Sequence, residues 1–141
     1  MFKKIVLSFI IYTLLYSNAS AQANRQVEIF DLTKEQVVKQ TPSSTDIQQE
    51  AKLLLNSMTT VYNKLNPIPT KGFMVKIPFE PPFKVKHPLF ENKVDEVILI
   101  FPAAEDPFLL VFTSEQKTRF FHFSADTEPL LKKIKFKRVF N

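Results

Sequence analysis

The two histidines, His87 and His122, are the first side chains to consider for chemistry in this chain of 141 residues. They stand thirty-five positions apart, and neither belongs to an H-x-H, H-x3-H or H-E-x-x-H motif. A zinc site usually takes three or four protein ligands, often clustered on one element. The chain also has no cysteine, which excludes disulfides, thiolate metal sites, iron–sulfur clusters and a cysteine nucleophile. We therefore expect no metal and no cofactor.

The carboxylates that could act as an acid and a base occur as two adjacent pairs, Asp95-Glu96 and Glu105-Asp106. A glycosidase needs two carboxyl groups about 5–9 Å apart across a cleft. Neighbouring residues of a strand point to opposite faces, so neither pair meets this requirement alone. Both pairs are more simply interpreted as polar ends of loops.

Nucleophilic serine chemistry has little support in the sequence. Ser124 is two residues from His122 and would share its strand face, but no residue type nearby orients the histidine as a base. The single glycine, Gly72, excludes phosphate loops and nucleophile elbows that need several. The sequence thus favours a protein that is not an enzyme.

A cluster of cations near the C-terminus is the most informative polar feature. It places five positive side chains in seven positions: Lys132, Lys133, Lys135, Lys137 and Arg138. In a strand, Lys133, Lys135 and Lys137 would line one face and could hold phospholipid head groups, a wall polymer or an acidic protein surface. The alternative is protection of a sheet edge, since edge lysines discourage aggregation of a protein with fifteen phenylalanines.

A second candidate contact surface lies in the proline-rich segment 77–83. Three prolines interrupt a good strand pattern there, and proline belongs at sheet edges and bulges. Phe79 and Phe83, if exposed beside these stiff residues, would form a patch for docking another protein. The alternative is a rigid kink between two strands.

The first 23 residues have the layout of a secretory signal peptide. Lys3 and Lys4 precede an apolar run, Ile5–Tyr16, and two A-x-A cleavage sites overlap within residues 19–23. We predict cleavage and a secreted, periplasmic or cell-envelope location in a bacterium, with no transmembrane helix after processing. The alternative is an uncleaved anchor, although a spanning helix needs about 20 mostly apolar residues.

The processed chain, residues 24–141, has the length of one small domain. Cleavage removes two lysines and no acids, so the net charge falls from +5 to +3. A charge of this size on an exported protein does not predict a nucleic-acid partner.

Apolar spacing predicts one long amphipathic helix over Thr45–Asn66, capped by Thr45 with Gln48 and ended by Asn66-Pro67. Its stripe has 3.6-residue periodicity and consists of Ile47, Ala51, Leu54, Leu55, Met58, Val61, Tyr62 and Leu65.

The remaining apolar segments predict strands in meander order. Alternation and unbroken apolar runs place them at Gly72–Glu80, Phe83–His87, Val94–Phe101, Phe108–Thr113 and Arg119–Ser124. The predicted fold class is therefore α+β, with one long helix packed on an antiparallel sheet of about four to five strands.

The two ends of the processed chain give weaker patterns. We predict a loosely ordered segment over 24–41 with a short helix at Lys34–Gln40, because Thr33 and Gln36 have capping-box spacing. At the other end we predict a brief helix over Glu128–Lys133, followed by an edge strand that carries the lysines.

The leading functional hypothesis is an exported binding or adaptor domain that contacts an envelope component or another protein, with an anionic surface as the expected partner. One alternative is a small hydrolase or ligand carrier with a pocket between helix and sheet, where His122 would be the polar group. Another is a structural protein that assembles with itself through an exposed strand.

Overall fold

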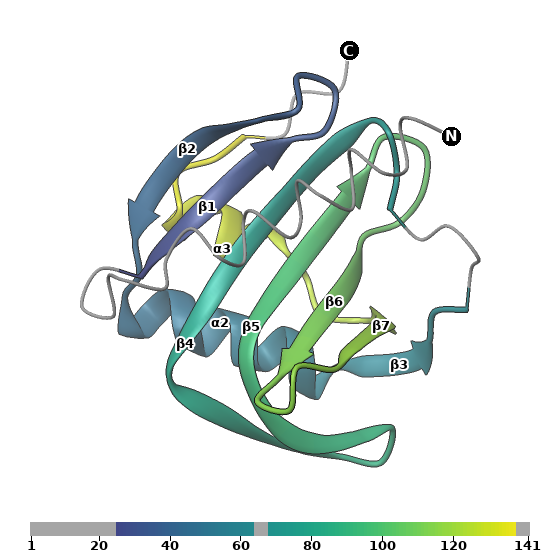
Figure 1. Cartoon of the computed structure of the whole chain (residues 1–141). Helices are drawn as coiled ribbons and strands as arrows, with labels where there is room; N and C mark the ends of the chain where they lie inside the picture. The colour runs from purple at the N-terminus through teal and green to yellow at the C-terminus, as the bar shows by residue number, and fades with distance from the viewer. Residues whose placement is uncertain (1–24, 64–67, 138–141) are drawn as a thin grey trace.

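The structure is a computed structural model that describes residues 25–63 and 68–137. The predicted signal peptide and Arg138 lie outside these ranges. The described residues form seven strands and two helices (Figure 1): β1 (Gln26–Asp31), β2 (Gln36–Pro42), α2 (Thr45–Asn56), β3 (Met58–Val61), β4 (Gly72–His87), β5 (Phe90–Pro102), β6 (Phe108–Thr113), β7 (Thr118–Phe123) and α3 (Glu128–Lys133).

All seven strands belong to one antiparallel sheet with the order β2-β1-β4-β5-β6-β7-β3. The predicted fold class, one long helix on four to five strands, is therefore wrong. Within residues 25–63 and 68–137 the chain is mostly sheet, with two short helices. The additional strands come from two segments, one predicted as part of the long helix and the other predicted to be loosely ordered.

The predicted helix over Thr45–Asn66 ends ten residues early, at Asn56. Ser44 rather than Thr45 caps its start, because the Ser44 hydroxyl accepts a hydrogen bond from the Ile47 amide at 3.2 Å. At the other end, the Ser57 hydroxyl donates to the Leu54 carbonyl and helps to close the last turn. Beyond it, Met58–Val61 pairs with β7, where the β-branched Thr59, Thr60 and Val61 suit a strand better than a helix.

The segment predicted to be loosely ordered forms the hairpin β1–β2. The Asp31 carboxylate accepts hydrogen bonds from the amides of Thr33 and Lys34, and Glu35 has φ +55°. This turn uses the polar residues that suggested a helix cap, so the short helix predicted over 34–40 is also wrong. β1 then pairs with β4 on its other side, which makes it an interior strand.

The predicted strands from residue 72 to residue 124 are confirmed, with one merger. Gly72–Glu80 and Phe83–His87 join into the 16-residue strand β4, whose register against β5 shifts between Pro78 and Phe83. The prolines therefore bend one strand rather than separate two.

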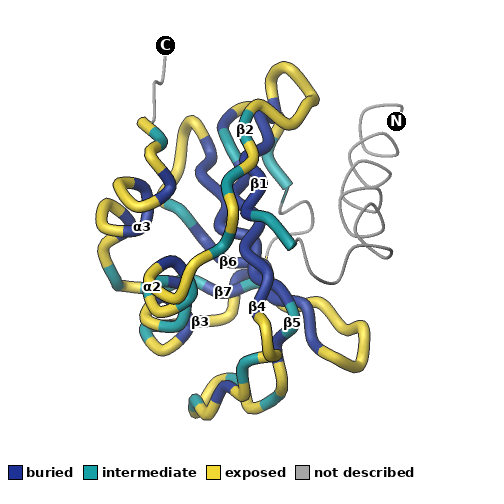
Figure 2. Tube along the Cα trace, turned by 90° about the vertical axis from the view of Figure 1, so that its left-hand side faces the viewer, coloured by how far each residue is buried: buried dark blue, intermediate teal, exposed yellow. Residues whose placement is uncertain are grey.

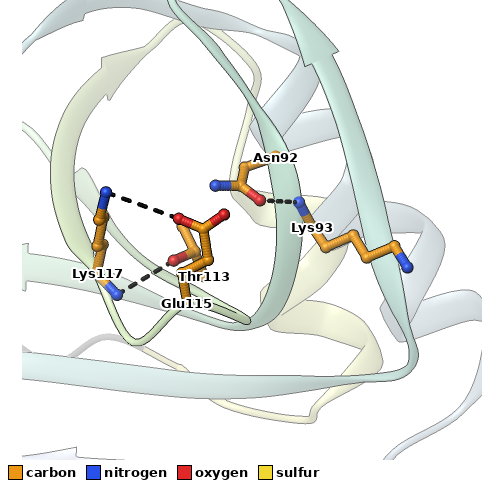
Figure 3. A network of polar contacts seen from close by, with 5 residues as sticks. All are labelled: Asn92, Lys93, Thr113, Glu115 and Lys117. Atoms are coloured by element: carbon orange, nitrogen blue, oxygen red, sulfur yellow. Dashed lines mark hydrogen bonds and ion pairs between the residues drawn. The ribbon is translucent and has the colours of Figure 1, made fainter.

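The turn between β6 and β7 shows how polar side chains shape a hairpin without glycine (Figure 3). Gln116 has φ +61°, and the Lys117 amide donates to the Thr113 hydroxyl at 3.1 Å. On the adjacent strand, the Lys93 amide donates to the Asn92 side chain. Lys117 also pairs with Glu115 in solvent, at 3.7 Å.

Both helices lie on one face of the sheet, which we call the inner face (Figures 1 and 2). The apolar stripe of α2 packs there with residues of six strands, including Ile29, Ile77, Leu99 and Phe121. The opposite, outer face carries a second apolar cluster that includes Phe30, Met74, Ile98, Ile100 and Phe108. Alternation along each strand produces the two clusters.

The only glycine of the chain begins β4 at a place where no other residue fits. Gly72 has φ +122°, and a Cβ there would lie 2.0 Å from the Phe101 carbonyl oxygen. Its own carbonyl accepts a hydrogen bond from the Leu32 amide. Gly72 thus allows the backbones of β4 and β5 to approach closely next to the end of β1.

Candidate functional site

The helix α3 fixes the position of the C-terminal lysines. It spans Glu128–Lys133, as the sequence predicted. The Phe136 amide donates to the Leu131 carbonyl, and the Lys135 amide donates to the Lys132 carbonyl. These two bonds form a Schellman motif, with Lys135 at φ +54° in the position that glycine usually takes.

The predicted edge strand after α3 is absent from residues 134–137, where the chain makes a turn and an extended tail without strand pairing. Lys133, Lys135 and Lys137 therefore do not line one strand face. Phe136 anchors the tail instead, with its ring 5.1 Å from that of Phe73 in an edge-on contact. Lys135 and Lys137, on either side of this anchor, are both exposed.

A lysine from a distant part of the sequence joins this tail. The Lys39 ammonium of β2 donates to the Lys135 carbonyl at 2.6 Å, across 96 positions of the chain. The bond satisfies a carbonyl just beyond the end of α3, and a cation near a helix C-terminus interacts favourably with the helix dipole. We call the resulting surface, made of Lys39, Lys135 and Lys137, the basic corner.

The other two lysines of the cluster have acidic neighbours. Lys133 donates to the Glu50 carboxylate of α2 at 3.0 Å and so links the two helices. Lys132 and Lys133 also line a surface hollow of about 440 Å³ together with Asp126, Glu128 and Pro129. Two acids and two lysines largely neutralise one another there. Of the cluster's four described lysines, Lys135 and Lys137 in the basic corner are therefore the two that neither pair with a described acid nor line this hollow.

The structure does not support a docking patch at Phe79 and Phe83. Phe79 is completely buried on the inner face, so its side chain is not available to a partner. Phe83 is half-buried, 5.6 Å from Phe79 between ring centroids, and the Lys52 ammonium lies 5.0 Å from its ring. Both rings serve the packing of α2 on the bent strand β4.

The described residues do not assemble the histidine pocket, the serine–histidine pair or the metal site that an enzyme would need. His122 lies on the outer face with its ring 4.7 Å from that of Tyr62, so it does not face a space between helix and sheet. The Ser124 hydroxyl donates to the Ser57 carbonyl rather than to a histidine. No group of three or more metal-ligating side chains occurs within residues 25–63 and 68–137. His87 accepts a hydrogen bond from the Leu89 amide and so stabilises the β4–β5 turn.

The outer face holds buried charges that the sequence analysis missed. The Lys76 ammonium lies 3.4 Å from the Glu28 carboxylate, and both side chains are less than 10% exposed. Gln40 donates to the second Glu28 oxygen at 3.2 Å. Glu96 is also buried, and desolvation raises the pKa of its carboxyl group, although Lys76 acts in the opposite direction. The sequence did contain one sign of this buried pair, because Lys76 stands between Val75 and Ile77 within an otherwise apolar strand.

Comparisons with known proteins return no match: none of the family models, curated proteins or solved structures is similar to this chain. No helix among the described residues is long and apolar enough to cross a membrane.

Proposed function

We propose that the protein is an exported, non-enzymatic binding domain of the bacterial envelope, and that the basic corner contacts an anionic partner. The carrying observation is the hydrogen bond from the Lys39 ammonium to the Lys135 backbone carbonyl, which brings Lys39 beside the tail that carries Lys135 and Lys137. Lys135 and Lys137 form no ion pair with any of the described residues. Their charge is thus available to a partner.

Export supports the same proposal. The signal-peptide pattern of residues 1–23 predicts export to a compartment where phospholipid head groups, wall polymers and acidic proteins are abundant. Attraction between exposed charges falls as salt screens them, with a Debye length of about 10 Å at 0.1 M and about 3 Å at 1 M. A partner held by the basic corner should therefore be released by salt.

The test is fractionation of native cells at low salt and at about 1 M salt, with intact mass measured on each fraction. We expect the processed chain on the envelope at low salt and in solution at high salt. The double variant Lys135→Gln/Lys137→Gln should be soluble at both. Lys84→Gln/Lys86→Gln is the matched control, because it removes the same charge from exposed positions of β4.

Equal envelope retention of the two double variants would contradict the role of the basic corner. An intact mass that still includes residues 1–23 would contradict the cleaved signal peptide, whatever the salt dependence. The two parts of the proposal are thus tested separately.

A further inference from the structure

The edge strand β2 lies beside the basic corner, and one of its sides has no strand partner among the described residues. β2 pairs with β1 only, and it spans seven residues, against four for the other edge strand, β3. Among the described residues, no backbone group outside β1 bonds to the backbone of residues 36–42. Free amide and carbonyl groups along an edge are a template for another strand.

The side chains of β2 do little to protect this edge. Val37 and Val38 are 37% and 40% exposed, and both are β-branched residues that favour pairing. Natural edge strands are usually blunted by an exposed lysine. The only lysine of β2, Lys39, instead has its ammonium bonded to the Lys135 carbonyl. Two protective features remain, namely the register shift against β1 between Ile29 and Phe30 and the proline, Pro42, that ends β2 and has no amide to donate.

The positive charge beside β2 determines which kind of added strand would be attracted to this edge. Lys39 projects from the strand itself, and its bond to Lys135 brings the tail with Lys137 to the same side. A second copy of this chain paired through β2 would bring two basic corners together, and like charges disfavour that pairing. An acidic segment would be attracted by the same charges.

We propose that β2 accepts an extended acidic protein segment as an eighth strand of the sheet, with the carboxylates of the segment beside the basic corner. This inference rests on the proposed function and names the class of its anionic partner. Backbone hydrogen bonds to β2 would supply affinity, and the lysines would supply the preference for acidic side chains. A phospholipid or a polymeric anion would use the lysines alone.

The test is amide hydrogen exchange by mass spectrometry, on the protein as isolated from cells, with two synthetic peptides. The first has eight residues of alternating Glu and Val, with both ends blocked. The second has the same sequence and charge but carries N-methyl groups on two adjacent central residues, which removes a donor from each edge of the peptide. Polyphosphate serves as an anion without a peptide backbone.

We expect the first peptide to slow exchange of the amides in residues 36–41 about tenfold at saturation, because pairing protects them. Exchange in β3, the other edge of the sheet, should not change and is the internal control. The N-methylated peptide should bind at least about tenfold more weakly, since lost backbone bonds remove affinity while charge is kept. Polyphosphate should leave exchange in β2 unchanged.

Two double variants test whether the basic corner contributes to peptide binding at the edge of β2. Lys135→Gln/Lys137→Gln should weaken binding of the first peptide, whereas Lys84→Gln/Lys86→Gln should not. Neither pair changes a residue of β2, so the strand itself stays intact in both proteins.

Three outcomes would overturn the inference. Equal binding of the two peptides would show attraction by charge alone, and the proposed function would stand without the added strand. Protection of β2 that grows with protein concentration and needs no peptide would show that a second copy occupies the edge. Absence of peptide binding would also reject the inference, and the cell fractionation would then decide the proposed function independently.

Discussion

The strands present Val, Ile, Leu and Phe to the two helices on the inner face of the sheet, whereas the outer face also buries Glu28, Lys76 and Glu96. The inner face is stabilised by apolar burial, which depends on close packing, so a cavity there lowers the free energy of unfolding. The outer face combines apolar contacts, such as Tyr62 stacked on Phe108 at 4.3 Å, with an ion pair. The stability of the inner face therefore depends on how closely its side chains pack, and that of the outer face depends also on how its charges are paired.

The difference has a thermodynamic consequence. Removing atoms from the inner face leaves a void, and removing one charge from the outer face leaves another charge without compensation. The first cost should be independent of pH between pH 4 and pH 7, and the second should vary with it. Three substitutions test this difference and a fourth tests the basic corner, from the largest expected effect to the smallest.

The largest effect is expected on the inner face, for Phe79→Ala. Phe79 is completely buried, and loss of a buried phenylalanine ring lowers the free energy of unfolding by about 3–5 kcal/mol. Phe83→Ala is the matched control, because half-buried Phe83 should cost about 1–2 kcal/mol. Urea unfolding of both variants measures the difference. Equal losses would show that the bend in β4, rather than burial of Phe79, carries the stability.

On the outer face, Lys76→Met should cost about 3 kcal/mol, because it leaves the buried Glu28 carboxylate without its cation. The double variant Lys76→Met/Glu28→Gln should recover most of this loss, since replacing both partners removes the uncompensated charge. Urea titrations at pH 7 measure both. A double variant as unstable as the single one would show that Lys76 stabilises the sheet by packing and not by charge.

A smaller effect of opposite sign is expected at the basic corner. Lys135 has φ +54°, a conformation that is costly for any residue with a Cβ, so Lys135→Gly should raise the free energy of unfolding by about 0.5–1 kcal/mol. Lys137→Gly removes the same charge without relieving such a strain and should lower stability slightly. The variant Lys135→Gly would thus be more stable and yet bind an anionic partner less well. Lower stability would contradict the strain at Lys135.

The smallest effect is a dependence on pH at Glu96. Burial raises the pKa of its carboxyl group above the ordinary value of 4.5. The folded protein then holds this proton more tightly than the unfolded chain, so stability from this group is present below pH 4.5 and is lost as pH rises through the folded pKa. Glu96→Gln should therefore be more stabilising at pH 7 than at pH 4. The free energy of unfolding of the unaltered protein and of Glu96→Gln should be measured from pH 4 to pH 7. A constant difference between them would contradict the raised pKa of Glu96.

Much of the sheet could be predicted from the sequence. Alternation at Phe73, Val75, Ile77 and Phe79, and the apolar runs near residues 97–101 and 108–112, correctly placed β4, β5 and β6. These elements are signalled locally, because side-chain direction repeats every two residues along a strand. The helix α3 was also predicted within its observed bounds.

The candidate site was predicted only in part. The lysines near the C-terminus were identified, but their arrangement as a strand face was wrong, and Lys39 was not considered. No local pattern connects Lys39 with Lys135, because their contact depends on where β2 and α3 lie in the folded chain. The sequence also left the burial of Phe79 undecided, since its place in the alternation fits the core while the flanking prolines also fit a surface patch.

The sequence by itself determined the alternation that makes the central strands, the apolar stripe of α2 and the concentration of cations near the C-terminus. Only the tertiary structure decided that Met58–Val61 is a strand, that β1 lies inside the sheet and that Lys39 joins the basic corner. The physical reason is the range of the interactions. Periodicity and capping act within a few residues, whereas strand pairing and charge clustering act between segments that meet only after the chain has folded.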